Sequence, residues 1–434
     1  MSAAVVLFTR DLRVHDHAAL ASAAEQYDAV LPLFVFDDAL LRKAGTPNRV
    51  AFLLQALGDL KEALRERGGD LAVRHGGVVG ETVLTARAAG ATTVFVGDAM
   101  SLYGQERLRR LHAELDVRVV NTATAIAPGE LVADGRDHYR VFTSYWRRWQ
   151  DEPLPVVRPA PARIVLPPDV DPGQLPTLRE VTSGETSPDL PSGGERAARH
   201  RLERWLAYGL QSYDEQRDDL ASDRTSRLSP YLHFGCLSAV EAITRARAAG
   251  RAAREFVRQL CWRDFYAQLL AANPHTPAED LHPRRQAWTV DEEALARWRT
   301  GHTGYPIVDA GMRQLHAEGW MHNRARLVVA AFLTKTLGLD WRHGARAFAD
   351  LLVDADVANN VGNWQWVAGT GVDTRPNRRF NPIAQARRHD SAGDYVRRYV
   401  PELAELDAHI VHEPWRAPLA RVAPEYPAPL ALET

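Results

Sequence analysis

The chain has 434 residues, enough for two or three domains that each bury a core of their own. Its composition, 45% hydrophobic and 25% charged with a formal net charge of −2, is typical of a globular protein and excludes a polycation. The two cysteines, Cys236 and Cys261, exclude a disulfide framework and a metal cluster built on cysteines.

The N-terminus predicts a strand and not a targeting segment. Residues 1–8 are largely apolar but carry no charged leader region and no cleavage site for a signal peptidase. Elsewhere the chain has no apolar run of about eighteen residues, the length that a membrane-spanning helix needs. We therefore expect a soluble protein of the cytoplasm that has no membrane partner.

Short, Val-rich apolar runs alternate with amphipathic stretches over the first 125 residues. Such runs are typical of parallel strands buried on both faces, and they occur at Ala4–Phe8, Val30–Phe36, Leu71–Arg74, Thr93–Val96 and Val117–Val120. Between them, residues 49–67 repeat apolar side chains at helical spacing. The alternation predicts an α/β domain over 1–125 with a doubly wound parallel sheet. No Gly-x-Gly-x-x-Gly follows the first run, so the usual dinucleotide fingerprint is missing.

The rest of the chain predicts a linker over 126–193 and an all-α domain over 194–434. Residues 151–193 hold ten of the 26 prolines and show little periodicity, so we expect them to lie over the surface. Helical spacing then recurs at Ala197–Tyr208, Ala239–Ala249, Arg254–Ala272, Ile307–Glu318, Asn323–Thr336 and Gly344–Val353. Nine of the eleven tryptophans lie in this part, which places the chemistry of the protein there.

The most unusual segment is 354–382. It opens with two acids, Asp354 and Asp356, and continues with adjacent amides, the tryptophans Trp364 and Trp366, and several glycines. Buried carboxylates and amides need partners, so this mixture suits a site for a large polar and aromatic ligand. Residues 375–398 hold seven arginines and two acids, which fits either a patch that faces phosphates or a solvated basic surface.

Two further features favour a bound cofactor. Residues 225–229, Thr-Ser-Arg-Leu-Ser, offer hydroxyls and backbone N–H groups ahead of a helix, which fits a phosphate cradle or a simple N-cap before Pro230. His322 has no matched acid or nucleophile, and such a histidine is more often structural than catalytic. Since no nucleophile elbow, Walker loop, paired-acid signature or zinc-ligand spacing appears, we expect a cofactor that carries the chemistry itself.

Together the motifs resemble the DNA photolyase/cryptochrome family, and closely its class I photolyases for cyclobutane pyrimidine dimers. In chain order they are Phe-Thr-Arg-Asp-Leu-Arg (8–13), Thr-Ser-Arg-Leu-Ser (225–229), Trp-Arg-Asp-Phe (262–265), Gly-Tyr-Pro-Ile-Val-Asp-Ala (304–310), Trp-Met-His-Asn-Arg (320–324) and Asn-Trp-Gln-Trp (363–366). The match extends to Tyr-Val-Pro-Glu (399–402) and so covers nearly the whole chain. The resemblance implies FAD, active in its reduced form, in the helical domain and no metal.

By this resemblance a U-shaped FAD is held by carboxylates, hydroxyls and amides of the helical domain. Arg326 would pair with Asp354, and Asn360 would lie beside flavin N5, where photolyases typically have asparagine. The residues implied for FAD binding are Tyr213, Thr225, Ser226, Arg227, Leu228, Ser229, Arg263, Asn323, Arg326, Asp354, Ala355, Asp356 and Asn360.

Three tryptophans match the relay that carries electrons from the surface of the family's proteins to the photoexcited flavin. They are Trp288, Trp341 and Trp364. A relay needs intermediate sites because electron tunnelling decays steeply with distance. Packing is the better explanation for any single tryptophan of a helical domain, but all three at the family's spacings favour the relay.

The resemblance also implies a monomer whose partner is UV-damaged DNA, double- or single-stranded. Trp262 and Trp366 match the pair that flanks a dimer flipped out of the duplex. Arginines that contact the backbone would add affinity that depends on salt and not on base sequence. The residues implied for DNA contact are Arg217, Gln259, Trp262, Asn323, Arg324, Trp366 and, as alternatives for one position, Arg378 and Arg379.

Two residues depart from the pattern of the dimer-repairing members. Gln259 stands where they usually have Glu, and Leu327 where they have Met. The Glu donates a hydrogen bond that steadies the dimer radical anion, so we expect Gln259 to keep binding and to lower the repair yield. Photolyases for (6-4) photoproducts often have Gln there, but they carry a His-His pair where this chain has His322-Asn323.

We therefore expect light-driven repair of cyclobutane pyrimidine dimers by electron transfer from excited reduced FAD to a flipped-out dimer. The alternatives are a cryptochrome-like blue-light photoreceptor, a photolyase for (6-4) photoproducts, and a non-photochemical flavoprotein or nucleotide-binding module that would not need the three tryptophans. The family's N-terminal domain usually holds an antenna pigment, which is a deazaflavin, a folate or a flavin. Arg49 and Asp98 lie near antenna positions, and the identity of the pigment stays open.

Overall fold

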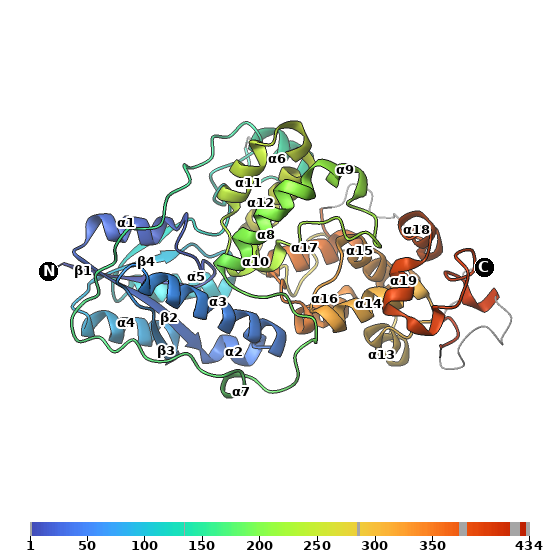
Figure 1. Ribbon diagram of the computed structural model, residues 1–434, viewed down its shortest axis with the longest axis horizontal. Coiled ribbons are helices and arrows are strands. Elements are labelled where there is room, and N and C mark those ends of the chain that lie inside the picture. Colours follow the sequence, from blue (N-terminus) through green and yellow to red (C-terminus); the bar gives the residue numbers. More distant parts are fainter. Residues whose placement is uncertain (1, 134, 284–286, 373–379, 417–425, 431–434) are drawn as a thin grey trace.

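Figure 1 shows an α/β layer at the N-terminal end of the molecule and a body of helices that extends from it to the C-terminus. This computed structural model describes residues 2–133, 135–283, 287–372, 380–416 and 426–430. It confirms the expected architecture, a doubly wound parallel sheet followed by an all-helical part. No helix within these ranges combines the length and the apolar composition that a membrane crossing requires.

The sheet has five parallel strands in the order β3-β2-β1-β4-β5. They overlap the five predicted apolar runs, with bounds that differ by one or two residues, and are β1 (Ala3–Leu7), β2 (Ala29–Asp37), β3 (Ala72–Gly76), β4 (Thr93–Gly97) and β5 (Asp116–Val120). Because the chain order reverses between β1 and β4, the carboxyl ends of these strands flank the place where such sheets usually bind ligands. We refer to this place as the switch point.

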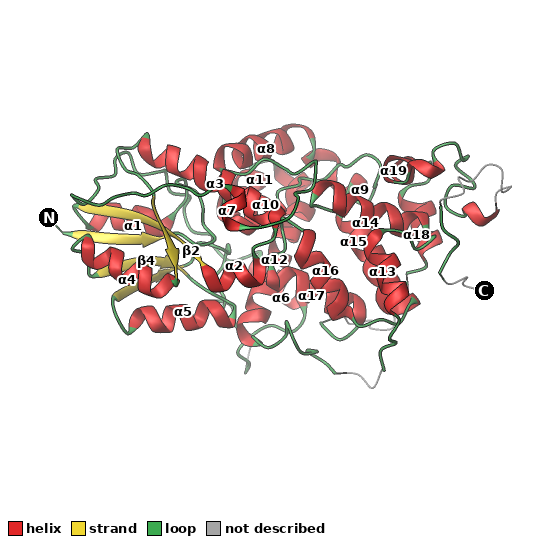
Figure 2. Cartoon of the chain, turned by 90° about the horizontal axis from the view of Figure 1, so that it is seen from below, coloured by secondary structure: helices red, strands yellow, loops and turns green. Residues whose placement is uncertain are grey.

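Helices cover both faces of the sheet, as Figure 2 shows from below. They are α1 (Ala18–Gln26), α2 (Asp38–Ala44), α3 (Pro47–Arg65), α4 (Val78–Ala88) and α5 (Leu102–His112). Alternate side chains of β1 point to opposite faces, so Ala4 and Val6 pack with α1 and α3, whereas Val5 and Leu7 pack with α4 and α5. The continuous apolar run of β1 is thus explained by burial on both faces.

Residues 151–193 run as an extended strap along the outside of the α/β layer (Figure 1). The strap is bonded to the sheet through its backbone, since the N–H of Val30 donates to the carbonyl of Val165 at 2.8 Å. It contains the four-residue helix α7 (Leu178–Val181). Helix α6 (Phe142–Trp149) precedes it within the range predicted as linker and packs against the helical body. The division of the chain into domains stays a prediction.

The helical body begins at residue 195. Its helices are α8 (Glu195–Tyr208), α9 (Tyr213–Gln216), α10 (Ser229–Phe234), α11 (Ala239–Arg247), α12 (Arg254–Ala272), α13 (Glu292–Thr300), α14 (Pro306–Glu318), α15 (Asn323–Ala331), α16 (Trp341–Leu351), α17 (Val357–Ala368), α18 (Pro382–His389) and α19 (Asp394–Tyr399). Helix α12 has the predicted bounds. The predicted helix Asn323–Thr336 is α-helical to Ala331 and ends in a wider π turn, Phe332–Thr336.

One hydrophobic core continues from the α/β layer into the first helices of the body. The ring of Phe52 on α3 stacks on Phe234 of α10 with centroids 4.9 Å apart, and its centroid lies 5.5 Å from that of Tyr231. The same cluster extends through α8, α11 and α12, whereas α13 to α19 surround a second core. Helix α17 contacts α12 and so lies where the two cores meet.

Candidate functional site

Two carboxylates stand just before α17. Asp354 Oδ2 forms the predicted ion pair with Arg326 Nη2 at 2.8 Å, and its other oxygen is buried without a hydrogen-bond partner among the described residues. Asp356 is the N-cap of α17, and its Oδ1 accepts from the N–H (2.9 Å) and the side-chain amide (2.7 Å) of Asn359. Its Oδ2 forms an ion pair with Arg10, which follows β1. The site thus offers buried acceptors, one of which is unused.

Asp356 stays ionised although it is buried. Burial by itself would raise the pKa of this carboxyl, but the positive charges of Arg10 and Arg263 and the N–H donated by Asn359 outweigh that effect and hold the pKa well below its usual range. The imidazole of His233 lies 4.0 Å from Asp356, and burial lowers its own pKa, so it is neutral near pH 7. A carboxylate that is charged at every working pH can accept hydrogen bonds from N–H or O–H groups of a ligand.

Residues 225–229 form a turn ahead of α10. Arg227 has a left-handed backbone, with φ of 51°, and its guanidinium lies 2.6 Å from Asp223 and 2.7 Å from Glu318. No side chain caps α10, so the simple N-cap is not formed. Because two carboxylates hold Arg227, a phosphate at this turn would be bound by hydroxyls and backbone N–H groups.

Four further residues predicted for FAD binding lie on α9, on α12, at the start of α10 and just before α17. Tyr213 is buried on α9, and burial raises the pKa of its hydroxyl to about 12. Arg263 of α12 donates to backbone carbonyls in the loop after β5 and in α10, which joins the α/β layer to the helices. The hydroxyl of Ser229 accepts from Trp320 Nε1 at 3.1 Å, and Ala355 is half-buried between the two carboxylates.

Trp364 is buried on α17, one turn after Asn360. Its ring packs against Gly344 of α16, where any Cβ would collide with the ring, and its Nε1 has no hydrogen-bond partner in the described part of the chain. The carbonyl of the next residue, Ala345, accepts from Asn360 Nδ2 at 2.9 Å. The innermost tryptophan and the amide predicted at flavin N5 are therefore both fixed against α16.

The other two predicted relay tryptophans lie at the start of α16 and in the segment before α13. Trp341 is the first residue of α16, is fully buried, and donates from Nε1 to Asp280 Oδ1 at 2.8 Å. Trp288 is half-buried, and the residue after it, Thr289, donates its N–H to the carbonyl of Gly338 at 2.8 Å. This bridge places Trp288 beside the segment that enters α16. Of the three tryptophans, Trp364 and Trp341 are thus buried and Trp288 is half-buried.

The residues predicted to contact DNA lie on neighbouring helices. Trp262 of α12 stacks face to face on Phe142 of α6, with centroids 3.6 Å apart and planes within 7°. Gln259 is exposed one turn earlier on α12, Trp366 is half-buried on α17, and Asn323 is exposed at the start of α15. The contact between α12 and α17 brings the two tryptophan-bearing helices together.

The arginines of this surface have acidic partners. Arg217 Nη1 lies 2.9 Å from Glu255, and Arg324 Nη2 lies 2.6 Å from Asp218. Both pairs are partly exposed, so a DNA phosphate would compete with a carboxylate for each guanidinium. The remaining predicted contact, for which Arg378 and Arg379 are the alternatives, lies outside the described residues.

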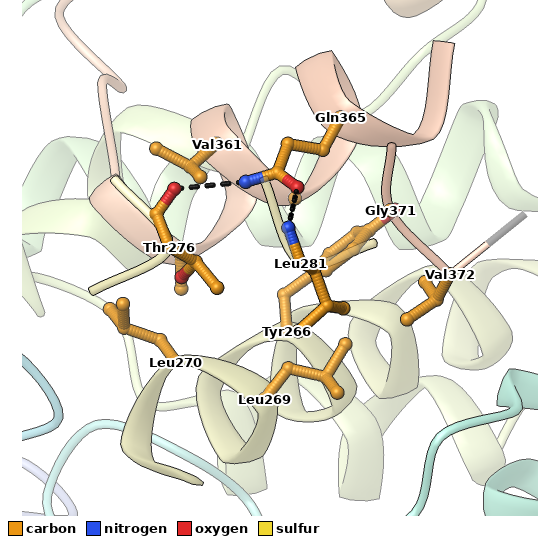
Figure 3. A pocket seen from close by; sticks show the side chains of 11 residues that line it. Tyr266, Leu269, Leu270, Thr276, Leu281, Val361, Gln365, Gly371 and Val372 are labelled. Atoms are coloured by element: carbon orange, nitrogen blue, oxygen red, sulfur yellow. Dashed lines mark hydrogen bonds between the residues drawn. The ribbon is translucent and has the colours of Figure 1, made fainter. Parts of the chain in front are cut away.

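Gln365, between the two tryptophans of α17, secures the loop that carries Asp280. Its Nε2 donates to the carbonyl of Thr276 at 2.9 Å, and its Oε1 accepts from the N–H of Leu281 at 2.8 Å (Figure 3). Nε2 also donates to the carbonyl of Glu279 at 2.9 Å. The cavity beside it, between α12 and α17, measures about 30 Å³ and has largely apolar walls. This volume suits a water molecule and not a ligand, so Gln365 has a structural role.

A second polar cluster lies at the switch point. Asp98 follows β4, burial raises its pKa to about 6, and its Oδ1 has no partner in the described ranges. Arg107 of α5 is half-buried, its buried Nε has no partner among the described residues, and Asp37 at the end of β2 accepts from Tyr103 at 2.7 Å. Arg49 instead donates to backbone carbonyls at the ends of α2 and α16, and burial lowers its pKa to about 10.

Three residues of these clusters were not predicted. Arg10 lies in the motif Phe-Thr-Arg-Asp-Leu-Arg, where a polar run directly after a buried strand was the available signal. Asp280 and Phe142 meet Trp341 and Trp262 from segments that carry no motif, so the sequence held no local sign of them.

Comparison with known proteins relates the chain to photolyases along its length. The profile described as DNA photolyase matches residues 4–164, and that of the FAD binding domain of DNA photolyase matches residues 256–432. A deoxyribodipyrimidine photo-lyase of Streptomyces griseus is 49% identical in an alignment of 440 residues, gaps included, that covers 99% of this chain and 96% of that protein.

Two solved structures are also similar. A class III photolyase of Agrobacterium tumefaciens has a TM-score of 0.92 at 32% identity, covering 99% of this chain and 94% of its own. A photolyase of Sulfolobus tokodaii, solved with two FAD molecules and interpreted as having a novel light-harvesting cofactor, has a TM-score of 0.87 at 29% identity, covering 99% and 96%.

Proposed function

The chain belongs to the DNA photolyase family, and from this premise we propose that it uses blue light to repair cyclobutane pyrimidine dimers in UV-damaged DNA. The observation that carries the proposal is helix α17. It has Asp356 at its N-cap and carries Asn360, the buried Trp364 and the half-buried Trp366. Hydrogen-bonding groups for a cofactor and two tryptophans therefore belong to one rigid element.

The polar groups of the site fit FAD. The unused oxygen of Asp354 and the charged Asp356 are acceptors for the hydroxyl and N–H groups of such a cofactor. The turn at 225–229 offers donors for its phosphates. Bound FAD, reduced and excited by light, would supply the electron that splits the dimer.

We assign the remaining roles to the residues that surround this cofactor. The amide of Asn360 would hydrogen-bond the flavin without adding charge. Trp364, Trp341 and Trp288 would pass electrons inward and restore the reduced cofactor. Trp262, held flat by Phe142, would stack with Trp366 on the flipped dimer, so the protein supplies orientation and exclusion of water and no nucleophile.

We also propose an antenna pigment at the switch point. Asp98 and Arg107 are half-buried there, and each has one buried atom without a partner among the described residues, which a polar pigment would satisfy. Whether that pigment is a deazaflavin, a folate or a flavin is read directly from the absorption spectrum of the purified protein. We further propose a monomer that works in the cytoplasm on double- or single-stranded DNA.

A repair assay tests the function. The purified protein with fully reduced FAD is mixed with an oligonucleotide that carries one cyclobutane dimer and is then illuminated with blue light. We expect the dimer to be converted to its two pyrimidines in the light and to persist in the dark. Protein that holds reduced FAD and leaves the dimer intact under illumination would refute the proposal.

Gln259 favours a second candidate, repair of (6-4) photoproducts, because it stands where the dimer-repairing members usually have Glu. The same assay with a (6-4) photoproduct distinguishes the two. A cryptochrome-like photoreceptor would repair neither lesion and would still photoreduce its flavin through the three tryptophans. Gln259→Glu should raise the repair yield of a cyclobutane photolyase.

A further inference from the structure

The loop after β1, residues 8–13, rests directly on the end of α10. Arg13 Nη1 donates to the carbonyl of Gly235 at 3.0 Å. Gly235 has a φ of 67°, and a Cβ on it would collide with the backbone carbonyl of Arg10, so glycine allows the loop and the helix to come this close. The motif Phe-Thr-Arg-Asp-Leu-Arg therefore forms a contact between the α/β layer and the helical body.

The Arg10 side chain reaches past this contact to Asp356. Its Nε donates to the carbonyl of His233 at 3.2 Å, and its Nη2 forms the ion pair with Asp356 Oδ2. Asn359 binds the other oxygen from within α17. The Asp356 carboxylate is thus held on both sides, once by its own helix and once by the α/β layer.

The groups around Asp356 come from three elements. Arg10 pairs with it directly, whereas His233 of α10 is neutral, and Arg263 of α12 has its guanidinium bound to two backbone carbonyls. Arg13 holds the loop on α10 independently of Arg10, through its bond to the carbonyl of Gly235. Its guanidinium is itself fixed by the carbonyls of residues 16 and 122. The docking therefore does not require the Arg10 guanidinium, which is directed at a carboxylate of the proposed flavin site.

We propose that Arg10 is a positioning residue of the flavin site, contributed by the α/β domain, and that it acts by holding the Asp356 carboxylate in place for FAD. The inference rests on the proposed function, in which Asp356 accepts hydrogen bonds from the cofactor. It adds a residue outside the helical domain to the determinants of FAD affinity.

A double-mutant cycle on FAD affinity tests the proposal. The variants are Arg10→Gln, Asp356→Asn, which keeps an N-cap side chain, and the two together. Arg10→Lys keeps the charge, and Arg110→Gln on the exposed side of α5 is the matched control. Affinity is measured by titrating FAD into the apoprotein, and circular dichroism reports whether each variant is folded.

We expect Arg10→Gln to weaken FAD binding about tenfold, the size typical of a lost hydrogen bond to a charged group, and Arg10→Lys to restore most of it. Arg110→Gln should bind as the unchanged protein does. In the Asp356→Asn background, Arg10→Gln should cause little further loss. On acidification, Arg10→Gln should release FAD at a higher pH than the unchanged protein, because Asp356 without Arg10 takes up a proton more readily.

Two outcomes would overturn the proposal. If Arg10→Gln weakens FAD equally with and without Asp356, Arg10 acts through docking of the loop. If Arg10→Gln binds FAD normally while Asp356→Asn does not, Arg10 has no part in the site. Failure of the unchanged protein to bind FAD at all would instead refute the proposed function, together with the inference that rests on it.

Discussion

The amide of Gln365 offers the sharpest test of how the helical body is held together. Gln365→Ala removes three hydrogen bonds and leaves one N–H and two carbonyls of the loop 276–281 without their partner. Each unsatisfied buried group costs about 1–3 kcal/mol, and partial access of water reduces the sum, so we expect a loss of about 3 kcal/mol in the free energy of unfolding. For 434 residues this corresponds to about 3 °C in Tm.

The loss is measured by thermal unfolding and by urea titration. Gln365→Met removes the hydrogen bonds but nearly keeps the side-chain volume, so it distinguishes the loss of hydrogen bonds from the creation of a cavity. Gln26→Ala on the exposed end of α1 is the control. Both Gln365 variants should be destabilised alike, because neither can bond the loop. A methionine variant as stable as the unchanged protein would show that volume, and not hydrogen bonding, explains the effect.

Three further predictions concern the relay, the switch point and the DNA surface. Trp364→Phe should abolish photoreduction of oxidised FAD, seen as bleaching of the flavin absorption under blue light; photoreduction at the original rate would remove Trp364 from the relay. Folding raises the pKa of Asp98 to about 6, so this group makes stability rise as pH falls from about 6 to 4, and Asp98→Asn should flatten that rise in urea titrations at several pH values. Affinity for damaged DNA falls as salt rises, and Arg324→Gln should make the slope of log affinity against log salt shallower by about one. An unchanged slope would exclude a phosphate contact.

The fold could be predicted because its signals are local. Each of the five strands overlaps a short apolar run, and burial of β1 on both faces explains why its run does not alternate. Helix α12 was bounded correctly because its apolar spacing is regular throughout. The wider turn after Ala331 was missed, since its side chains continue the helical pattern and only the hydrogen bonding changes.

The candidate site was predicted less completely, since much of it depends on contacts between distant segments. The pair Arg326–Asp354 followed from the resemblance and is present in the structure. Nothing near Arg10 in the sequence shows that it pairs with a residue 346 positions away, and Phe142 lies in a range predicted as linker. The roles assigned to individual residues stay predictions until the variants are measured.

The core that continues from α3 into α8 to α12 has a consequence for how the protein denatures. Domains that share little surface melt separately, but here the aromatic rings of Phe52 and Phe234 belong to one packed cluster. Losing the α/β layer would expose that cluster on the helices, so neither part is expected to persist alone. Calorimetry should then show one cooperative transition in which the α/β layer and the helical body unfold together. Its calorimetric and van't Hoff enthalpies should be equal.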